Sequence, residues 1–497
     1  MTPTADRNPS EPVLVAWGTA SQREDDPLVA IEPLELMLRA ADRALQVPGN
    51  GGLGSAIQRI YTPRGRWTYR NPGSAIARHI GSPGAETVMT TVGVLQQTLI
   101  GDACRSIRDG EIDTALVIGG DCGYRLLQAA RAGTELTDTD QEDDPDRVMA
   151  PKDELRHPAE LRVGLRMPVG LYAMIHSALA TLKGTGGEAY FRSVSEVHAG
   201  LSRVAADNPD AWDRQAVSTD DIMNADRSNR MQSYPYTRLH CSNWSVDQAG
   251  GLFFCSKAKA DALGIPDDNR IHPLASAESN NMVQVSRRGE LHGCPGARIA
   301  GKAALDAAGL TVTDLDLLDL YSCFPAAVEI FASELGIPLD RPLTITGGMT
   351  FAGGPYNNYI LQATCRMADL LREARQSGAR PQTGMISCVS GVITKQAFGL
   401  WSNHPGVPFA FADVTQEVAA ETPVKEVHMD HDGPATVVGS TVLHERGNAP
   451  KAIIIADTPG GHRVVCESDN PGATEAVESG LNGACVTVRE GRFFELA

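Results

Sequence analysis

Two tyrosines and one cysteine in the second half of the chain have side chains suited to chemistry. Tyr321 opens the segment YSCF, Tyr356 follows a Gly-Gly-Pro turn, and Cys388 opens the segment CVSG. A thiol can move a proton, and a phenol can donate a hydrogen bond or act as an acid if its pKa is lowered. For each of these residues, packing in the core is the alternative interpretation.

The bulk composition excludes several classes of protein. A chain of 497 residues is too long for one core, so we expect two or three domains. Its net charge of −17 argues against nucleic-acid binding. No apolar run reaches the roughly 18 residues that a membrane span needs, and Met1–Pro12 lacks the apolar core of a signal peptide. The ten cysteines form no CxxC pair, which favours reduced thiols and, with the points above, a cytoplasmic protein.

Helical and strand-like patterns alternate twice along the chain, which is typical of α/β units. The first half has helical periodicity over 33–46 and 92–109, followed by a buried strand over 114–119. The second half has a helix over 296–309, a strand over 314–320 and a helix over 325–335 that Ser322 could cap. Two similar halves suggest a duplication.

The remaining segments predict two further units. Residues 123–235 form an excursion from the first half that could act as a lid, and its acidic stretch 134–153 is expected to be a solvated loop. Short strand patterns after residue 414 predict a small barrel or an oligomer-binding (OB)-like fold. The predicted domains are 12–122 with 236–268, 123–235, 269–415 and 421–497.

Five motifs, in order, resemble those of the thiolase superfamily. They are the segment 93–121 (GVLQQ to VIGGD), SVDQAGGLFFCS at 245–256, YSCF at 321–324, the glycines of 347–355, and CVSG at 388–391. With the stretch YPYTRL and the C-terminal β segment, the chain is most similar to bacterial thiolase-like proteins of type 1. The resemblance implies an α/β thiolase fold, with duplicated halves in five αβαβα layers, plus a small C-terminal all-β OB-like domain.

The chain departs from the thiolase pattern at its reactive positions. Gly93 stands where thiolases carry the nucleophilic cysteine, and Gly354 replaces the histidine of their GHP motif. The resemblance places Cys388 at the acid–base position and Tyr321 where thiolases order an oxyanion-hole water; Tyr356 and Tyr359 could serve similarly. We therefore predict the following site residues: Cys388, Tyr321 and Tyr356 as catalytic, and Gly93, Gly354, Phe324 and Asn243 as substrate-pocket residues.

Arginines near the lid are the candidates for binding the phosphates of coenzyme A (CoA): Arg227, Arg230 and Arg238. A CoA thioester is expected as substrate or ligand, with no bound cofactor. The sequence shows no histidine, cysteine and aspartate clustering typical of a metal site, and His176 and His240 are interpreted as structural.

The resemblance leaves several functions open. The first is an acyl-CoA protein of lipid metabolism, related to acetyl-CoA acetyltransferases, which works without an acyl-enzyme at position 93. The alternatives are a non-catalytic CoA binder, a thiolase-fold aldolase acting on acyl-CoA, and a scaffold. A homo-oligomer is also possible.

Overall fold

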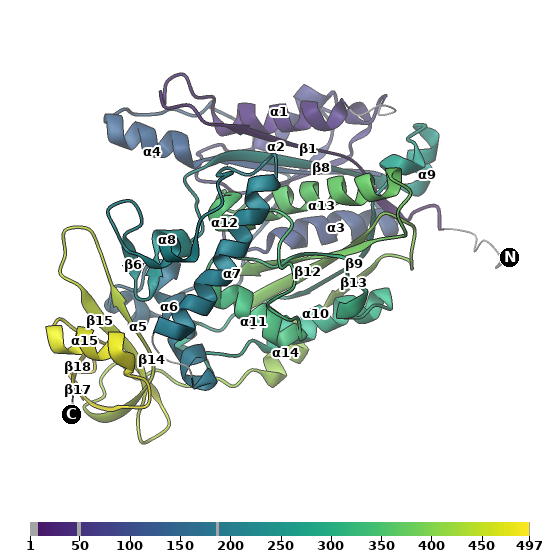
Figure 1. Ribbon diagram of the computed structural model, residues 1–497. Coiled ribbons are helices and arrows are strands. Elements are labelled where there is room, and N and C mark those ends of the chain that lie inside the picture. Colours follow the sequence, from purple (N-terminus) through teal and green to yellow (C-terminus); the bar gives the residue numbers. More distant parts are fainter. Residues whose placement is uncertain (1–7, 47–50, 185–187, 497) are drawn as a thin grey trace.

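The computed structural model describes residues 8–46, 51–184 and 188–496. The first seven residues of the polar start lie outside this range. In the described chain two β-sheets alternate with three layers of helices, so that helices cover both outer faces and also fill the space between the sheets (Figure 1). This is the five-layered arrangement that the resemblance to thiolases implies. No described helix has the length and apolar character needed to cross a membrane.

The first sheet belongs to the N-terminal half. Strand β4 (Thr114–Cys122) is buried along its whole length and pairs antiparallel with β8 (Asp247–Ser256), which is also fully buried. A strand covered on both faces must be apolar or very small throughout, which explains the TALVIGG and AGGLFF runs. In the described chain the strand order is β1 (Pro12–Gln22), β8, β4, β2 (Arg59–Pro63), β3 (Glu86–Thr90) and β5 (Arg147–Met149).

The second sheet repeats this plan in the C-terminal half. Strand β11 (Thr383–Ser390) pairs parallel with β10 (Leu317–Asp319) and antiparallel with β12 (Lys395–Ser402). The order in the described chain is β10, β11, β12, β9 (His272–Ser279) and β13 (Ala410–Asp413). Cys388 therefore lies on β11, one strand away from the end of β10 that leads into Tyr321.

The helices occupy the three remaining layers. Helices α3 (Gln96–Arg108) and α13 (Tyr359–Gln376) lie between the sheets (Figure 1). The outer faces are covered by α1 (Pro33–Leu45) and α2 (Pro72–Ile80) on one side and by α10 (Pro295–Ala308) and α11 (Pro325–Leu335) on the other. Shorter helices α9 (Lys257–Ala262), α12 (Gly348–Phe351) and α14 (Thr415–Glu421) join these elements.

Three expectations about element ends need correction. The helix predicted from residue 92 begins at Gln96, because Gly93 has φ +102° and Leu95 is extended. The strand predicted over 314–320 shortens to Leu317–Asp319, since Val312–Asp314 form a 3-10 turn. Ser322 does not cap α11; its hydroxyl accepts a hydrogen bond from the Met349 amide instead.

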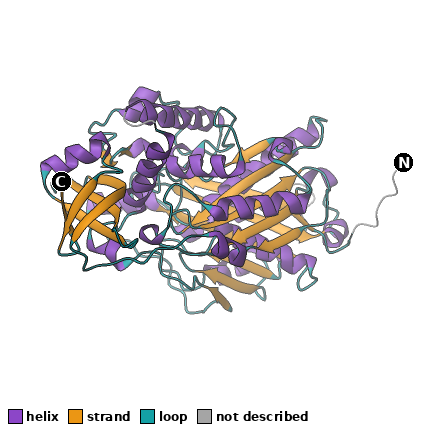
Figure 2. Cartoon of the chain, turned by 90° about the horizontal axis from the view of Figure 1, so that it is seen from below, coloured by secondary structure: helices purple, strands orange, loops and turns teal. Residues whose placement is uncertain are grey.

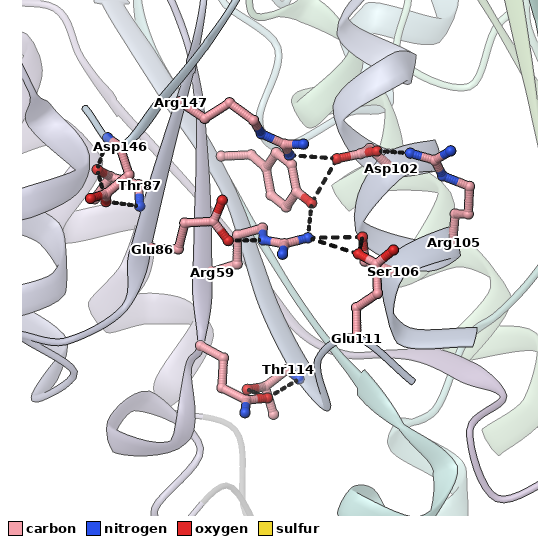
Figure 3. Close-up of polar contacts among 12 residues, drawn as sticks. Arg59, Glu86, Thr87, Asp102, Arg105, Ser106, Glu111, Thr114, Asp146 and Arg147 are labelled. Atoms are coloured by element: carbon pink, nitrogen blue, oxygen red, sulfur yellow. Dashed lines mark hydrogen bonds and ion pairs between the residues drawn. The ribbon is translucent and has the colours of Figure 1, made fainter. Parts of the chain in front are cut away.

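A buried carboxylate fixes α3 against the first sheet. Asp102 accepts hydrogen bonds from Arg105 at 2.5 Å, from Arg147 at 2.8 Å and from the Tyr61 hydroxyl at 2.9 Å. Figure 3 shows the two guanidinium groups approaching Asp102 from opposite sides. Burial acts to raise the pKa of Asp102, but these three donors outweigh it and hold the pKa below its usual value. The carboxylate is therefore charged and ties strands β2 and β5 to the central helix.

The acidic stretch 134–153 is exposed or half-buried throughout, as its composition indicates, but it is also held against the first half. Asp138 accepts hydrogen bonds from the amide and hydroxyl of Thr68, and Asp146 does the same with Thr87. Directly after Asp146, Arg147–Met149 joins the first sheet as β5, next to β3. These aspartates thus accept hydrogen bonds from backbone amides of the first half. The stretch 134–153 forms an ordered strap along that half.

The rest of the segment 123–235 covers one end of the molecule. It contains α4 (Gly123–Ala132), α5 (Pro158–Arg162), α6 (Pro168–Lys183), α7 (Glu188–Asp207), α8 (Thr219–Met223) and the hairpin β6 (Met231–Ser233) and β7 (Tyr236–Thr237). Helix α6 is apolar on most sides and buried, because it packs between α11 and strand β14 (Gly433–Leu443) of the C-terminal domain.

The C-terminal domain is a small β-barrel (Figure 2). Strands β14, β15 (Lys451–Asp457), β16 (Arg463–Ser468), β18 (Phe493–Leu496) and β17 (Cys485–Arg489) follow one another in that order, and β14 pairs with both β15 and β17, which closes the ring in the described chain. Strand β14 also bonds to β6, so the barrel and the segment 123–235 share a sheet. The domain is not purely β, because Asn470 caps a helix, α15 (Pro471–Gly480), between β16 and β17.

Buried histidines form part of the packing around α6 and α7. His240 contacts Thr237 and Ser195 at 2.9 Å each, and the ring of His198 lies 5.7 Å from that of His240. His176 contacts the Tyr236 hydroxyl at 3.1 Å. Burial lowers the pKa of His198 to about 4 and that of His176 to about 3. His176 and His198 are therefore neutral groups within the packing. This agrees with the interpretation of His176 and His240 as structural residues.

We predict that this cluster makes the fold sensitive to acid. An unfolded histidine takes up its proton near pH 6.5, whereas His198 in the folded chain does so only near pH 4, so stability falls as the pH drops through this window. Between pH 6 and 4.5, the free energy of unfolding should fall less steeply with decreasing pH in His198→Leu than in the native chain. The two slopes should differ by up to about 1.4 kcal/mol per pH unit. Urea unfolding at several pH values measures this slope.

The control is Leu201→Ala, which opens a void in the neighbouring core without changing a titrating group. It should lower stability equally at all pH values. An unchanged slope in His198→Leu would contradict the assignment.

Candidate functional site

A cavity of about 500 Å³ lies where α3 begins. This volume is within the range of small-molecule sites, roughly 300–1,000 Å³. The predicted site residues that line it are Gly93, Gly354, Phe324, Tyr321 and Tyr356. The cavity is thus built where the thiolase-like motifs of both halves meet, and the described segment 155–172 forms a further wall.

The Gly93 loop has a backbone that only glycine adopts readily. Gly93 has φ +102°, and a Cβ there would lie 2.8 Å from Pro151 Cγ. Its carbonyl accepts hydrogen bonds from Lys395 Nζ at 2.6 Å and from Ser390 Oγ at 3.1 Å. Glycine at this position is therefore required by the strap residue packed against it, and it leaves the loop without a nucleophile.

Cys388 is not in the described cavity lining, although its neighbours Val389 and Ser390 are. The side chain is fully buried, and burial raises the pKa of its thiol to about 12, although the amides of Gln97 and Gln96 at the start of α3 act in the opposite direction. At neutral pH the sulfur is consequently a protonated thiol, which is neither a nucleophile nor a base.

Tyr321 is in a different position, because its half-buried ring lines the cavity. Its backbone amide donates to Ser387 Oγ at 2.8 Å, which fixes the end of β10 against β11. Burial, and then the nearby thiols of Cys323 and Cys388, raise the pKa of Tyr321 well above its usual value. The phenol therefore keeps its proton and serves as a hydrogen-bond donor, not as an activated acid.

Tyr359, which the sequence placed with Tyr356, has a structural role. Its hydroxyl donates to the buried carboxylate of Asp319 at 2.7 Å and contacts Thr346 at 2.6 Å. Asp319 also accepts hydrogen bonds from Thr344 and from backbone amides of the 344–346 turn. The network joins the end of β10 to the start of α13, and Tyr359 does not line the cavity.

The position of the missing histidine is filled by another side chain. A Cβ at Gly354 would overlap Ser242 Oγ, so no residue larger than glycine fits there without a shift. Asn243 is not part of the lining; its backbone accepts from the Gly354 amide at 2.8 Å and donates to Met349 at 3.0 Å. Asn243 thus positions the cavity wall, and Ser242 presents its hydroxyl to the cavity.

Sequence reasoning missed several lining residues. Tyr172 on α6 stacks on Phe324 at 4.6 Å and is hydrogen-bonded to the thiol of Cys323. Arg156 and Arg166 reach the cavity from the segment before α6. These residues belong to no thiolase motif and lie in the excursion, so spacing could not have found them. Lys395, which lies outside the described lining and contacts the Gly93 carbonyl, did have a signal, because it is a lysine at the start of a largely apolar strand.

The arginines predicted to bind CoA lie apart from the cavity lining. Arg227 and Arg238 are exposed and Arg230 is half-buried, and Arg238 Nε donates to the Ser228 carbonyl at 2.8 Å. Of residues 227–238, only Gln232 belongs to the described cavity lining.

The cavity is rich in hydrogen-bond donors and poor in bases. Its described lining contains phenols, hydroxyls, thiols and two guanidinium groups, but no carboxylate, imidazole or lysine amine. Such a lining can stabilise negative charge that develops on a bound oxygen.

Comparisons with known proteins agree on the fold. No protein-family model matches the chain. The acetyl-CoA acetyltransferase of Methanocaldococcus jannaschii is 28% identical over 102 residues, 20% of this chain and 26% of that protein. The acetyl-CoA acetyltransferase of Chromobacterium violaceum is 32% identical over 146 residues, 29% of this chain and 33% of that protein. The chain thus spans only about a quarter to a third of these relatives.

Solved structures match much more of the chain. The Ltp2-ChsH2(DUF35) aldolase has a TM-score of 0.59 at 18% identity and covers 80% of this chain and 99% of its own. A monomeric SCP2-thiolase-like protein type 1 from Mycobacterium smegmatis has a TM-score of 0.83 at 25% identity, covering 98% of this chain and 99% of its own. Because this likeness extends over 98% of the chain, the chain has the fold of a thiolase-like protein.

Proposed function

We propose that this protein binds an acyl-CoA thioester in the cavity and acts on its carbonyl group without forming an acyl-enzyme. The observation that carries the proposal is the convergence of Tyr321, Tyr172 and Cys323 in one cavity beside the Gly93 loop. All three are neutral donors, because burial raises the pKa of each.

A set of neutral donors in one cavity suits one kind of chemistry. When the carbon next to a thioester loses a proton or breaks a bond to carbon, charge moves onto the thioester oxygen as an enolate. The backbone of Tyr321 is fixed by the hydrogen bond from its amide to Ser387 Oγ. Its phenol can therefore hydrogen-bond to that oxygen with little rearrangement. No covalent bond to the protein is needed for this step, which agrees with a glycine at position 93.

Two arginines could hold the anionic groups of the ligand. Arg166 is exposed at the cavity edge, and Arg156 is half-buried beside Tyr172 with its Nε atom lacking a hydrogen-bond partner in the described structure. An under-satisfied guanidinium in a cavity favours a phosphate or carboxylate. We therefore assign Arg156 and Arg166 to CoA or to an acidic acyl group, in place of Arg227, Arg230 and Arg238.

A CoA-dependent binding protein without turnover is the second candidate. The observation in its favour is that no base lines the described cavity, so a proton-abstracting group would have to come from the ligand or from water. The two candidates share the same bound thioester and differ only in whether a product appears.

We predict that Tyr321→Phe weakens recognition of the thioester but not of CoA. Isothermal titration with CoA and a series of acyl-CoAs should show that the variant loses roughly three- to tenfold in affinity for acyl-CoA, the equivalent of one neutral hydrogen bond. Any product seen by mass spectrometry with the native chain should form at least about 100-fold more slowly in the variant.

Tyr124→Phe is the matched control, since that tyrosine bonds to Asp25 on the surface, away from the cavity. Arg156→Gln should weaken the binding of CoA and acyl-CoA alike. Binding of acyl-CoA without product would support the binding protein without turnover. The absence of binding at millimolar concentrations of ligand would exclude both candidates.

A second prediction concerns the cysteines. Iodoacetamide at pH 7.5 should modify the exposed Cys485 and leave Cys388 and Cys323 intact, because the pKa of each buried thiol is raised to about 12. The intact mass of the protein should also stay unchanged after incubation with acetyl-CoA. Rapid alkylation of Cys323, or a stable acyl adduct, would show a reactive thiol and contradict the non-covalent mechanism.

A further inference from the structure

A cluster of two imidazoles and one carboxylate lies where the chain enters the C-terminal barrel. Glu426 and His428 are on the extended segment after α14, and His462 is in the turn between β15 and β16. The segment is hydrogen-bonded to the barrel: the His428 amide donates to the Arg463 carbonyl at 2.8 Å, and the Arg463 amide to the Glu426 carbonyl at 2.8 Å.

The backbone register explains why these side chains meet. Val427 and Arg463 form a parallel bridge, and the Arg463 side chain points inward, with an exposed fraction of 1%. Side chains alternate across an extended strand, so the neighbours Glu426, His428 and His462 all face solvent on the same side. The sequence analysis found no clustering typical of a metal site; the barrel creates it by joining segments far apart in the chain.

The distances between the side chains are those of a nearly assembled chelate. One Glu426 oxygen lies 3.7 Å from His428 Nε2, and the other lies 3.7 Å from His462 Nδ1. All three groups place a ligand atom within 4.8 Å of one another, the only such group found in the described residues. Ligands of a tetrahedral zinc ion, bound at about 2.0–2.1 Å, are about 3.3 Å apart, so the ligand atoms must move closer together by up to about 1.5 Å.

From this geometry we propose that Glu426, His428 and His462 bind a divalent transition-metal ion of the zinc class. Two imidazole nitrogens and one carboxylate are a ligand set that suits Zn²⁺, Co²⁺ or Ni²⁺, and water completes the coordination. The imidazole rings now stack at 3.9 Å with a tilt of 16°, so each must rotate to bring its nitrogen toward the ion. Both rings are half-buried at the surface and have room to do so.

Neighbouring cations do not compete for the carboxylate. Lys425 Nζ and Arg463 Nε are each 2.7 Å from Asp457, on the opposite side of the segment. Glu426 has no such partner among the described residues other than the two imidazoles. A bound cation therefore meets one carboxylate charge that is not neutralised by a protein cation.

The ion would act as a staple between two parts of the chain. Residues 424–428 leave the second thiolase half, and His462 belongs to the barrel, so one ion would fix the linker to the domain it leads into. Because the site is separate from the cavity, the inference does not depend on the proposed function.

The test uses the full-length, tag-free protein with ZnCl₂ and CoCl₂. The native chain should bind one Co²⁺ with a visible absorption band that Zn²⁺ displaces, and Zn²⁺ should raise the melting temperature. His428→Ala and His462→Ala should each lose more than about tenfold in affinity, since even changes outside the ligand shell cost that much. Glu426→Gln should lose the same.

His292→Ala is the matched control, because His292 lies 3.7 Å from Glu290 in a surface pair that lacks a second imidazole. It should bind as the native chain does. Circular dichroism without metal checks the folding of each variant, and glutamine replaces histidine where alanine fails to fold. No Co²⁺ band in the native chain, or equal affinity in the His428 and His462 variants, would overturn the proposal.

Discussion

The position of helix α3 between two β-sheets is the constraint on which the rest of the structure depends. Most of a helix in this layer is buried, so its buried polar groups need partners within the protein. Gln96 accepts from the amide of Ile360 on α13 at 2.8 Å, and Gln97 donates to Ser276 on β9 at 3.1 Å. With Asp102 bound to the first sheet, these contacts connect both halves and hold the first turn of α3 at the cavity floor.

This constraint also determines the electrostatics of the site. The amides at the start of α3 favour negative charge on Cys388, yet the burial imposed by the layered packing is the larger effect and keeps the thiol protonated. The same burial keeps Tyr321 and Tyr172 neutral. A fold that holds a reactive thiolate in thiolases here surrounds a cavity of neutral donors, which shows why chemistry has to be argued from the site and not from the fold.

The C-terminal barrel contributes to the cavity indirectly. Strand β14 packs against α6, which carries Tyr172, and bonds to β6, whose Gln232 reaches the cavity lining. The barrel thus supports the wall formed by the excursion 123–235. A metal ion bound by Glu426, His428 and His462 would stiffen the linker to this support without touching the cavity.

The sequence by itself determined the architecture and the positions that match the thiolase motifs. Buried apolar runs such as 114–122 and helices that start at a proline and end before a glycine, such as 325–335, are local signals. The ordered motifs located Gly93, Gly354, Phe324, Tyr321 and Tyr356, which the structure brings into one cavity. Local pattern was enough because each strand and helix must be apolar on the faces that the layers cover.

Tertiary structure alone decided what lies around those positions. Tyr172, Arg156 and Lys395 reach the site from elements whose packing is not encoded in spacing, and the strap 134–153 is ordered by partners about 70 residues away in the chain. Burial likewise set the protonation of Cys388, and the barrel alone brings His428 beside His462. The physical reason is that contacts, desolvation and charge pairing act between residues close in space, whereas sequence patterns report only which faces are covered.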